Sequence, residues 1–427
     1  MTALHHSARP LSPLLTGVAL LLLGTGLLNT LLSVRAVQNG MGSTLLGLVM
    51  SAYFVGFILG TFLAPWAIRR MGHIRTFACC AALASSAVLG HALSDHPGVW
   101  MGLRAVTGVA LVGLYAVVES WLAAQAHGPQ RGRVFAVYMI VNLLALAAGQ
   151  FLMLLAPVQG FALFALIAML VNLSLIPIAA TRLEQPMAPH SPRLHIGEMA
   201  RIAPTAAAGA LLSGLAMGAF WGMTPAFAQT SGADARGVAV FMSTAILGGA
   251  TLQWPLGRLS DGRDRRETLR LVAVMALGVA VIAGILGLWQ PAALPALMFL
   301  YGGLAFAAYP IGVAHLSDRL PTERVLEGAS VCLLLHGAGA ALGPALAGLL
   351  MSALAPAALF LHFALCWGAL TVYTQWRLVR DRPLDTPPAD ASPFVPMLRT
   401  SPVALELLAD DTADPAAFAA PQHDRLP

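Results

Sequence analysis

The sequence predicts an all-α polytopic membrane protein, with twelve transmembrane helices in two six-helix bundles related by a pseudo-twofold axis. Its 427 residues are 58% hydrophobic and only 10% charged, whereas soluble domains average about 25% charged residues. Nearly uncharged runs recur along the chain, and a run of about 18 residues can cross a ~30 Å hydrocarbon core as a helix. Several residues also recur at a nearly constant offset, which indicates a duplicated unit.

The apolar runs and the polar breaks between them set the predicted elements. They predict helices over residues 13–35, 43–68, 75–94, 99–126, 133–156, 160–181, 202–228, 236–258, 269–289, 292–316, 325–353 and 355–376. The same breaks predict an N-terminal six-helix bundle (1–181), a cytoplasmic linker (182–201), a C-terminal six-helix bundle (202–377) and a disordered cytoplasmic tail (378–427). The tail is rich in proline and aspartate, and such a composition cannot bury enough apolar surface to fold.

The arginines predict the orientation in the membrane. Nearly all of those near helix ends fall on the side that holds the linker and both termini, and only Arg35 and Arg236 fall on the other side. The positive-inside rule therefore predicts that both termini are cytoplasmic. We expect a multi-pass protein of the cytoplasmic (inner) membrane, in contact with membrane lipids.

The composition also excludes several chemistries. The chain has no lysine, which excludes a phosphate-binding loop completed by lysine and any lysine Schiff base. Its four cysteines all lie within apolar spans and indicate neither a disulfide framework nor a metal site. We expect no cofactor, no metal and no nucleic-acid partner. An enzyme is disfavoured, because the spans contain no paired carboxylates and no recognisable hydrolase motif.

The two halves of the chain repeat one another. At an offset of 192 residues the matched pairs are Gly26 with Gly218, Gly40 with Gly232, Met50-Ser51 with Met242-Ser243, and Gly56 with Gly248. At an offset of 194 they are Gly108 with Gly302, Tyr115 with Tyr309, and Gly149 with Gly343. A parallel duplication of six helices is a feature of secondary transporters.

One short stretch concentrates charge between two apolar runs. "GRLSDGRDRR" (257–266) carries six charges in ten positions. It resembles the loop motif G-x-L-a-D-r-x-G-r-R, which joins the second and third helices of each half in the major facilitator superfamily. The matching positions include Gly257, Asp261, Arg265 and Arg266, whereas Gly262 and Asp264 depart from the motif.

The first half carries weaker versions of the family's motifs. In "PWAIRRMGHIRT" (65–76), Arg70 and Gly72 fit the loop motif, but Arg69 stands where the family has an aspartate. "RAVTGVALVG" (104–113) resembles the R-x-x-x-G signature of the fourth helix through Arg104 and Gly108. The fifth-helix segment "ALAAGQFLML" (145–154) lacks the proline of the family's antiporter motif, which weakens the case for drug–proton antiport.

The resemblance implies a cytoplasmic gate. An aspartate near a helix end can pair with arginines and with the N-terminal dipole of a neighbouring helix, and a pair between the two bundles can close the cytoplasmic side in one state. The alternative is that these arginines only fix the topology and bind lipid phosphates. The gate is favoured for Asp261, Arg265 and Arg266, and the alternative is favoured for Arg69 and Arg70.

One acidic and one basic residue stand out well inside the predicted spans, and both belong to the fourth helix. Arg104, Gly108, Leu111, Tyr115 and Glu119 follow steps of three or four and therefore share one face, which we expect to line an interior cavity. Such residues are functional candidates because they are costly to keep in a membrane. Glu119 is interpreted as a gate residue paired with an arginine, as a proton carrier, or as a residue that reaches the interface. Arg104 either contacts an anionic substrate group or binds neighbouring helices.

Other features complete the candidate site. Trp100 and Trp121 are expected to anchor the fourth helix at the two interfaces. His336 is the best titratable group near the midplane, either for proton coupling or as a hydrogen-bonded packing residue, and we expect it to face Asn142 across the pseudo-twofold axis. The predicted substrate-binding residues are Asn29, Arg104, Tyr115, Asn142, Trp221, Tyr309 and His336.

The predicted function is that of a secondary active transporter. Two bundles rock about a central cavity and carry a small organic molecule, amphipathic or modestly anionic, in exchange for or together with protons. The main alternative is a receptor or regulator without transport activity, which signals through the tail on the same scaffold.

Overall fold

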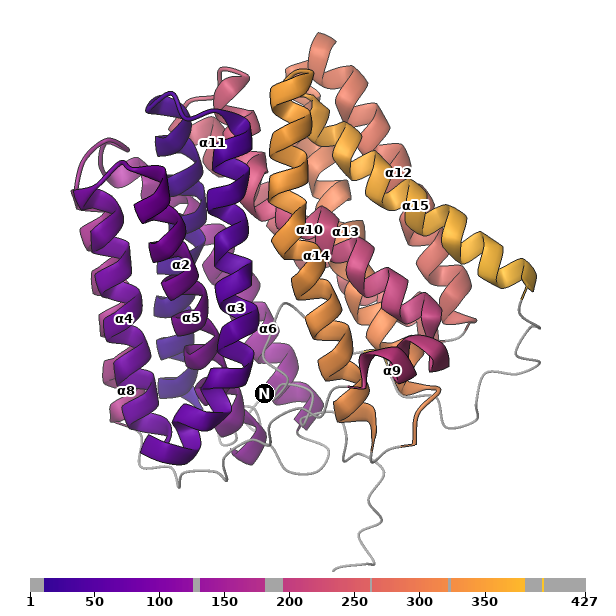
Figure 1. Ribbon diagram of the computed structural model, residues 1–427, viewed down its shortest axis with the longest axis horizontal. Coiled ribbons are helices and arrows are strands. Elements are labelled where there is room, and N and C mark those ends of the chain that lie inside the picture. The colour runs from indigo at the N-terminus through magenta and orange to yellow at the C-terminus, as the bar shows by residue number, and fades with distance from the viewer. Residues whose placement is uncertain are drawn as a thin grey trace, which may run out of the picture.

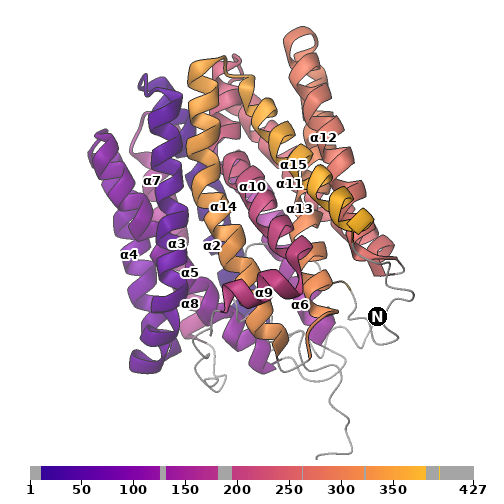
Figure 2. The same ribbon diagram turned by 45° about the vertical axis from the view of Figure 1, so that its right-hand side comes forward.

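The computed structural model describes residues 11–125, 131–180, 195–261, 263–321, 324–380 and 394. The chain folds into helices that run alternately up and down (Figure 1, Figure 2). Their bounds are α2 (Ser12–Gln38), α3 (Ser43–Met71), α4 (His73–Leu93), α5 (Pro97–Gln125), α6 (Arg131–Phe151), α7 (Ala162–Leu173), α8 (Leu175–Ala179), α9 (Ile196–Ile202), α10 (Pro204–Thr230), α11 (Ala235–Asp261), α12 (Arg265–Trp289), α13 (Leu294–Ser317), α14 (Val325–Ala353) and α15 (Ala358–Arg380). Short 3₁₀ turns, η2 (Leu152–Leu155) and η3 (Pro291–Ala293), follow α6 and precede α13.

The predicted helices are present within a few residues of their expected bounds. Among the described residues, twelve helical segments are long and apolar enough to cross a membrane. The sixth is divided at Ser174 into α7 and α8, because Pro177 lacks the N–H that would continue the helical ladder. The linker also contains α9, a two-turn helix that was not predicted. Most of the linker and of the tail, as well as Gly262, lie outside the described residues, so the domain boundaries stay predictions.

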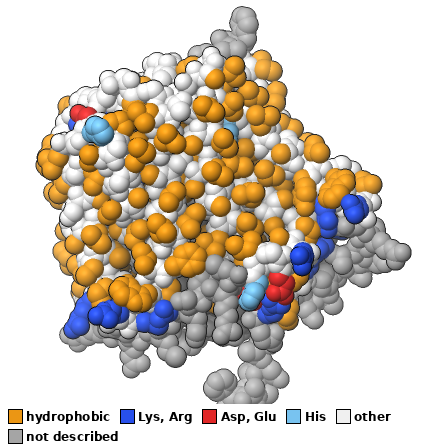
Figure 3. Space-filling view, in the orientation of Figure 1, with side chains coloured by type: hydrophobic (Ala, Val, Ile, Leu, Met, Phe, Trp, Pro, Cys, Tyr) orange, Lys and Arg blue, Asp and Glu red, His pale blue; other side chains and the backbone are white. Residues whose placement is uncertain are grey.

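The surface has the banding of a membrane protein. Hydrophobic side chains cover the middle of the molecule, and arginines follow the edge near α9 (Figure 3). We call that edge the linker side, and the edge with turns 39–42, 94–96 and 231–234 the far side. On the linker side, arginines stack on exposed tryptophans: Arg70 lies over Trp66 and Arg258 over Trp254. These pairs suit an interface, where the ring meets apolar chains and the cation meets water.

Glycines place equivalent helices of the two halves in the same contacts. A methyl group added to Gly56 or Gly108 would collide with the backbone across the α3–α5 crossing, and Gly248 and Gly302 are in the same position at the α11–α13 crossing. The α2–α6 and α10–α14 crossings repeat this with the matched glycines Gly26 and Gly218, and Gly149 and Gly343. The turn glycines Gly40 and Gly232 both have positive φ, 74° and 89°, a conformation that favours glycine. The repeat read from the sequence is therefore a structural repeat.

The two halves meet along a seam close to the far side. The Ser33 hydroxyl on α2 donates to the Gly222 carbonyl on α10 at 2.7 Å, and the Ser243 hydroxyl on α11 donates to the Ala147 carbonyl on α6 at 2.9 Å. The Ala345 N–H on α14 donates to the Ser51 hydroxyl on α3 at 3.2 Å. At a rise of ~1.5 Å per residue, each of these residues lies within about 12 Å of the far end of its helix.

Candidate functional site: a polar pocket between two buried ionisable residues

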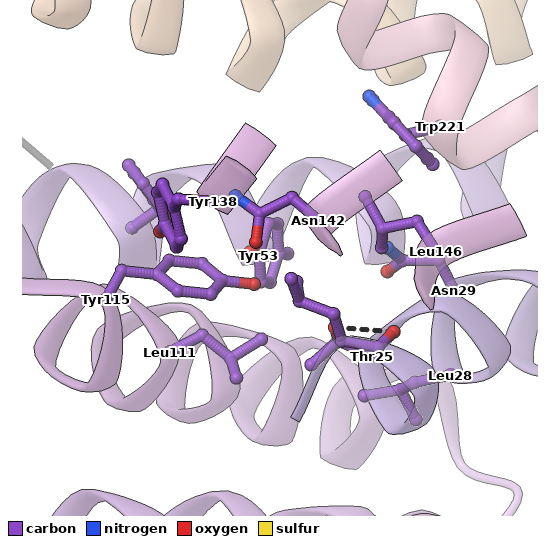
Figure 4. Close-up of a pocket in the computed structure, with 12 residues that line it drawn as sticks. Thr25, Leu28, Asn29, Tyr53, Leu111, Tyr115, Tyr138, Asn142, Leu146 and Trp221 are labelled. Atoms are coloured by element: carbon purple, nitrogen blue, oxygen red, sulfur yellow. Dashed lines mark hydrogen bonds between the residues drawn. The ribbon is translucent and has the colours of Figure 1, made fainter. Parts of the chain in front are cut away.

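A pocket opens among four helices of the first half and one of the second. It encloses an empty volume of about 660 Å³, its open mouth included. Figure 4 shows the polar and aromatic side chains that converge on it. The lining residues are Leu22, Thr25, Leu28 and Asn29 of α2, Tyr53 and Phe57 of α3, Leu111 and Tyr115 of α5, Tyr138, Asn142 and Leu146 of α6, and Trp221 of α10.

Helical spacing puts these side chains on the faces that meet. Thr25 and Asn29 are four residues apart on α2, as are Leu111 and Tyr115 on α5, and residues three or four apart share one face of a helix. Four of the predicted substrate-binding residues therefore lie together in the pocket: Asn29, Tyr115, Asn142 and Trp221. Tyr53 and Tyr138 also line the pocket but were not predicted, because aromatic residues at helical spacing do not differ from packing residues until the helices are assembled.

Arg104 lies behind the pocket and touches two of its walls. Its side chain is buried, and Nη2 donates to Oδ1 of Asn29 at 2.9 Å. The guanidinium carbon also lies 4.5 Å from the ring centroid of Tyr53, a cation–π distance. The structure thus shows Arg104 bound to neighbouring helices, which is one of its two predicted roles. The lining residues Asn29 and Tyr53 separate its guanidinium group from the pocket.

Glu119 lies behind the opposite end of the pocket. The carboxylate is fully buried, and its Oε1 accepts a 3.0 Å hydrogen bond from the hydroxyl of Tyr138, a lining residue. Fifteen residues of α5 separate Arg104 from Glu119, which corresponds to roughly 22 Å. The pocket is therefore flanked along α5 by a cation at the far-side end and an acid at the linker-side end. Arg104 reaches the pocket through Asn29 and Tyr53, and Glu119 reaches it through Tyr138.

The stripe of small and polar residues on α5 turns inward, as its spacing predicts. Gly108 packs on the backbone of α3, and Leu111 and Tyr115 line the pocket. The expectation that Trp100 and Trp121 anchor the helix at the lipid interface is wrong, because both rings are buried in the protein. Trp100 donates to the carbonyl of Ser94, and Trp121 packs against His73.

The remaining predicted substrate-binding residues form a separate cluster in the second half. His336 on α14 approaches the Ser213 hydroxyl of α10 through Nδ1 at 3.2 Å, and its ring lies 4.7 Å from that of Tyr309 on α13. Neither His336 nor Tyr309 is among the lining residues of the pocket. Asn142 lines the pocket, whereas His336 belongs to this separate cluster. The expectation that the two residues face each other across the pseudo-twofold axis stays a prediction.

The charged loop motif forms ion pairs within the second half. Arg265 pairs with Asp318 at the end of α13, with 2.5 Å between Nε and Oδ2, and with Asp261 one turn earlier at 3.4 Å. Arg266 binds both carboxylate oxygens of Asp264. Burial raises the pKa of Asp264, but the hydrogen bonds from Arg266 outweigh it, so that the pKa lies below its usual value. Asp318 was not predicted as a partner, because only the fold brings the end of α13 beside the start of α12.

The first-half counterpart of the motif turns the chain at its glycine. Gly72 has φ of 80° and ends α3, and it lets the chain turn directly into α4. Arg70 is exposed and lies over Trp66, which suits the anchoring role favoured for it from sequence. Among the described residues, no group of three His, Cys, Asp or Glu side chains is placed to hold a metal ion.

The twelve candidate spans of the described residues, in two repeated halves with a polar pocket between helices of both, are typical of a helical membrane transporter. The chain belongs to the Major Facilitator Superfamily, whose family model matches residues 14–325 and 206–410. An uncharacterized MFS-type transporter of Enterobacter sp. (strain 638) is 27% identical over 359 residues, which cover 84% of this chain and 93% of the relative. The uncharacterized MFS-type transporter YcaD of Escherichia coli O17:K52:H18 is 28% identical over 83% of this chain and 92% of its own.

Solved structures share the fold. The nucleoside transporter NupG superposes with a TM-score of 0.70 at 13% identity and covers 88% of this chain and 100% of its own. A D-xylose-proton symporter superposes with a TM-score of 0.65 at 15% identity and covers 86% of this chain and 96% of its own. At such low identity the likeness concerns the fold alone.

Proposed function

We propose that this transporter carries a small organic solute by alternating access and couples it to protons. The observation that supports this most strongly is the pocket, which residues of both halves line and which lies between buried Arg104 and Glu119. A solute bound there touches Trp221 of the second half and the helices of the first half together. Its binding can therefore bias how the two halves sit against each other.

In this structure the seam joins the two halves at the far side. We therefore assign the structure to a conformer that the solute enters from the linker side. Hydroxyl groups and glycines bring α2, α3 and α6 into contact with α10, α14 and α11 there. Rocking of the halves about the pocket would open this seam and close the linker side. With the positive-inside orientation, the linker side faces the cytoplasm and both termini are cytoplasmic. Impermeant thiol reagents applied to cells, with single cysteines in the 39–42 and 195–202 segments, test this orientation.

The lining favours a solute with both polar and flat apolar surface. Asn29 and Asn142 offer amide donors and acceptors, and Tyr53, Tyr115 and Trp221 offer ring faces. Arg104, bound to Asn29, suits a modest negative charge on the solute. The structural neighbours named for nucleosides and for D-xylose fit a polar organic cargo.

Glu119 is the favoured proton carrier, and His336 is the second candidate. Glu119 is buried, as a carrier needs to be, and Tyr138 links it to the pocket. A buried acid that reaches the solute through one hydroxyl can couple its protonation to binding. A protein named as a D-xylose-proton symporter shares the fold, which also supports proton coupling.

The test begins with the purified protein. A thermal-shift screen against small amphipathic and anionic solutes selects ligands, and liposomes with an imposed pH gradient then measure their movement. Gradient-driven movement lost in Glu119→Gln but kept in His336→Ala assigns the coupling to Glu119, and the converse assigns it to His336. Movement unaffected in both variants would contradict proton coupling by either residue. No movement of any ligand that binds would contradict the transport function.

A further inference from the structure

A residue of the C-terminal tail binds the charged loop motif. The backbone N–H of Phe394 donates to Oδ1 of Asp261 at 2.8 Å. The ring of Phe394 lies on Gly257, where a methyl group added to the glycine would meet three of its carbon atoms before any other atom. Phe394 is partly buried and packs against the apolar core. The tail was expected to be disordered, which stays a prediction, and Phe394 is the one residue after 380 that the structure describes.

Gly257 and Asp261 form a two-part notch for this residue. They are four residues apart on α11 and therefore share one face of the helix. The missing side chain of Gly257 leaves room for an aromatic ring, and the Asp261 carboxylate, 36% exposed, supplies an acceptor one turn further on. Gly257 and Asp261 are both positions of the loop motif, so Phe394 contacts two positions of the motif at once.

The contact uses a carboxylate that also belongs to the ion pairs of the loop motif. The Oδ1 atom that accepts from Phe394 also pairs with Arg265 at 3.4 Å. In the cytoplasmic gate that the family resemblance implies, Asp261 would pair across the two halves when the linker side closes. A tail residue seated on Gly257 and Asp261 would then stand in the way of that pairing.

We propose that Phe394 is an intramolecular brake, which docks in the notch formed by Gly257 and Asp261 and holds the transporter in the conformer closed on the far side. The docking itself stands on the contacts above, and its effect on the conformational cycle rests on the proposed alternating access. Release of Phe394 would free Asp261 and speed closure of the linker side. Phe394 thereby sets how often the cycle runs, although it is not among the lining residues of the pocket.

The docking is tested by photo-crosslinking of the full-length protein in membranes. Benzoylphenylalanine in place of Phe394 is expected to capture the α11 peptide that contains Gly257–Asp261, identified by mass spectrometry. The matched control carries the same residue in place of Trp376, an exposed aromatic residue of α15. In a second background, Gly257→Ala adds a methyl group that meets the Phe394 ring first, and capture should fall. Absence of the 394 crosslink, or equal capture from position 376, would overturn the docking.

The brake is tested by a conformational readout that needs no solute. A cysteine in place of Ser33, at the far-side seam, reports opening of that side through its rate of reaction with an impermeant maleimide. Phe394→Ala is expected to raise this rate about fivefold, the change in an equilibrium expected for the loss of roughly one buried contact. A crosslink at 394 together with an unchanged rate would refute the brake and keep the docking. Failure of the solute screen would leave both readouts intact, so the two proposals fail separately.

Discussion

The hydroxyl group of Tyr138 donates a 3.0 Å hydrogen bond to a carboxylate oxygen of Glu119. Tyr138 belongs to α6 and lines the pocket, whereas Glu119 belongs to α5 and is completely buried. The bond therefore connects the most deeply buried acid of the described chain to the surface that a solute would touch. If Glu119 carries the proton, this hydroxyl is where solute and proton sense each other.

Removal of the Tyr138 hydroxyl group is expected to uncouple solute movement from proton movement. A hydrogen bond to a charged group contributes about 1.5–3 kcal/mol, so Tyr138→Phe should lower gradient-driven transport about tenfold or more. The matched control is Ser120→Ala, on α5 beside Glu119, since its hydroxyl donates to the Ala116 carbonyl of its own helix. Transport in liposomes with a pH gradient measures both. Equal rates in Tyr138→Phe and in the control would show that the bond plays no part in coupling.

The ion pair of Arg265 with Asp318 is expected to stabilise the second half strongly. Arg265 is 3% exposed and Asp318 12% exposed, and an ion pair this buried costs about 3–5 kcal/mol to break from one side. Asp318→Asn should therefore lower the unfolding temperature in detergent clearly. Asp95→Asn breaks the pair with Arg35 at the far side, but Asp95 is 57% exposed, so a cost of about 1 kcal/mol or less is expected. Similar shifts in the two variants would contradict this ranking.

A large residue in the far-side seam is expected to force the halves apart. A side chain at Gly348 would meet the Ser43 carbonyl and the Gly47 backbone, neither of which can rotate away. Overpacking costs about 1–3 kcal/mol, so Gly348→Leu should raise far-side labelling of a Ser33→Cys reporter about tenfold. Gly278→Leu is the control, because no described atom lies within 4 Å of an added methyl group there. Unchanged labelling in Gly348→Leu would mean that the seam does not set the conformation.

The linker helix is expected to loosen in acid. Glu198 on α9 accepts a 2.8 Å hydrogen bond from Nη1 of Arg324, and His195, just before α9, lies 2.6 Å from Oε1 of Glu327. The hydrogen bond from Arg324 lowers the pKa of Glu198 below its ordinary value of 4.5. The contribution of this carboxylate is therefore complete above the ordinary value and is lost as the pH falls through the lowered one.

A fluorophore on the linker helix measures this release. Gly197→Cys offers an attachment point with open space around it, and emission is followed from about pH 7 to about pH 3. The acid transition is expected in the parent protein and should be clearly smaller in Glu198→Gln, which lacks the titrating group. Superimposable curves for the two proteins would assign the transition to other groups.

The fold could be predicted from the sequence because hydropathy and repetition are properties of the chain alone. Apolar runs of membrane-spanning length define the helices, and Gly56 and Gly248 could be matched before any contact was known. The inward direction of Arg104 and Glu119 followed from helical spacing and the cost of charge in lipid. The short helix α9 was missed because its seven residues have no long apolar run, and ion pairs to the start of α14 hold it in place.

The site could be predicted only in part, because it depends on which helices meet. Asn29 and Asn142 stood out as polar residues within spans, and both line the pocket. Tyr138 and Asp318 could not be recognised from the sequence, because their roles depend on partners that lie on other helices. Trp100 was misread for the same reason: an interfacial ring and a buried ring look alike until the turn at Ser94 folds over it.

The hydroxyl bonds of the far-side seam make separation of the halves inexpensive. The carbonyls of Gly222 and Ala147, which accept from Ser33 and Ser243, sit inside helices. A carbonyl oxygen has two lone pairs, one of which the helix already uses. When the halves part, these oxygens keep their helical partner and the freed serines can turn to their own helix backbone or to water. Separation at these bonds would thus leave no polar group without a partner in an apolar environment. In the alternating access that we propose, the halves would therefore part and rejoin here at little cost in free energy.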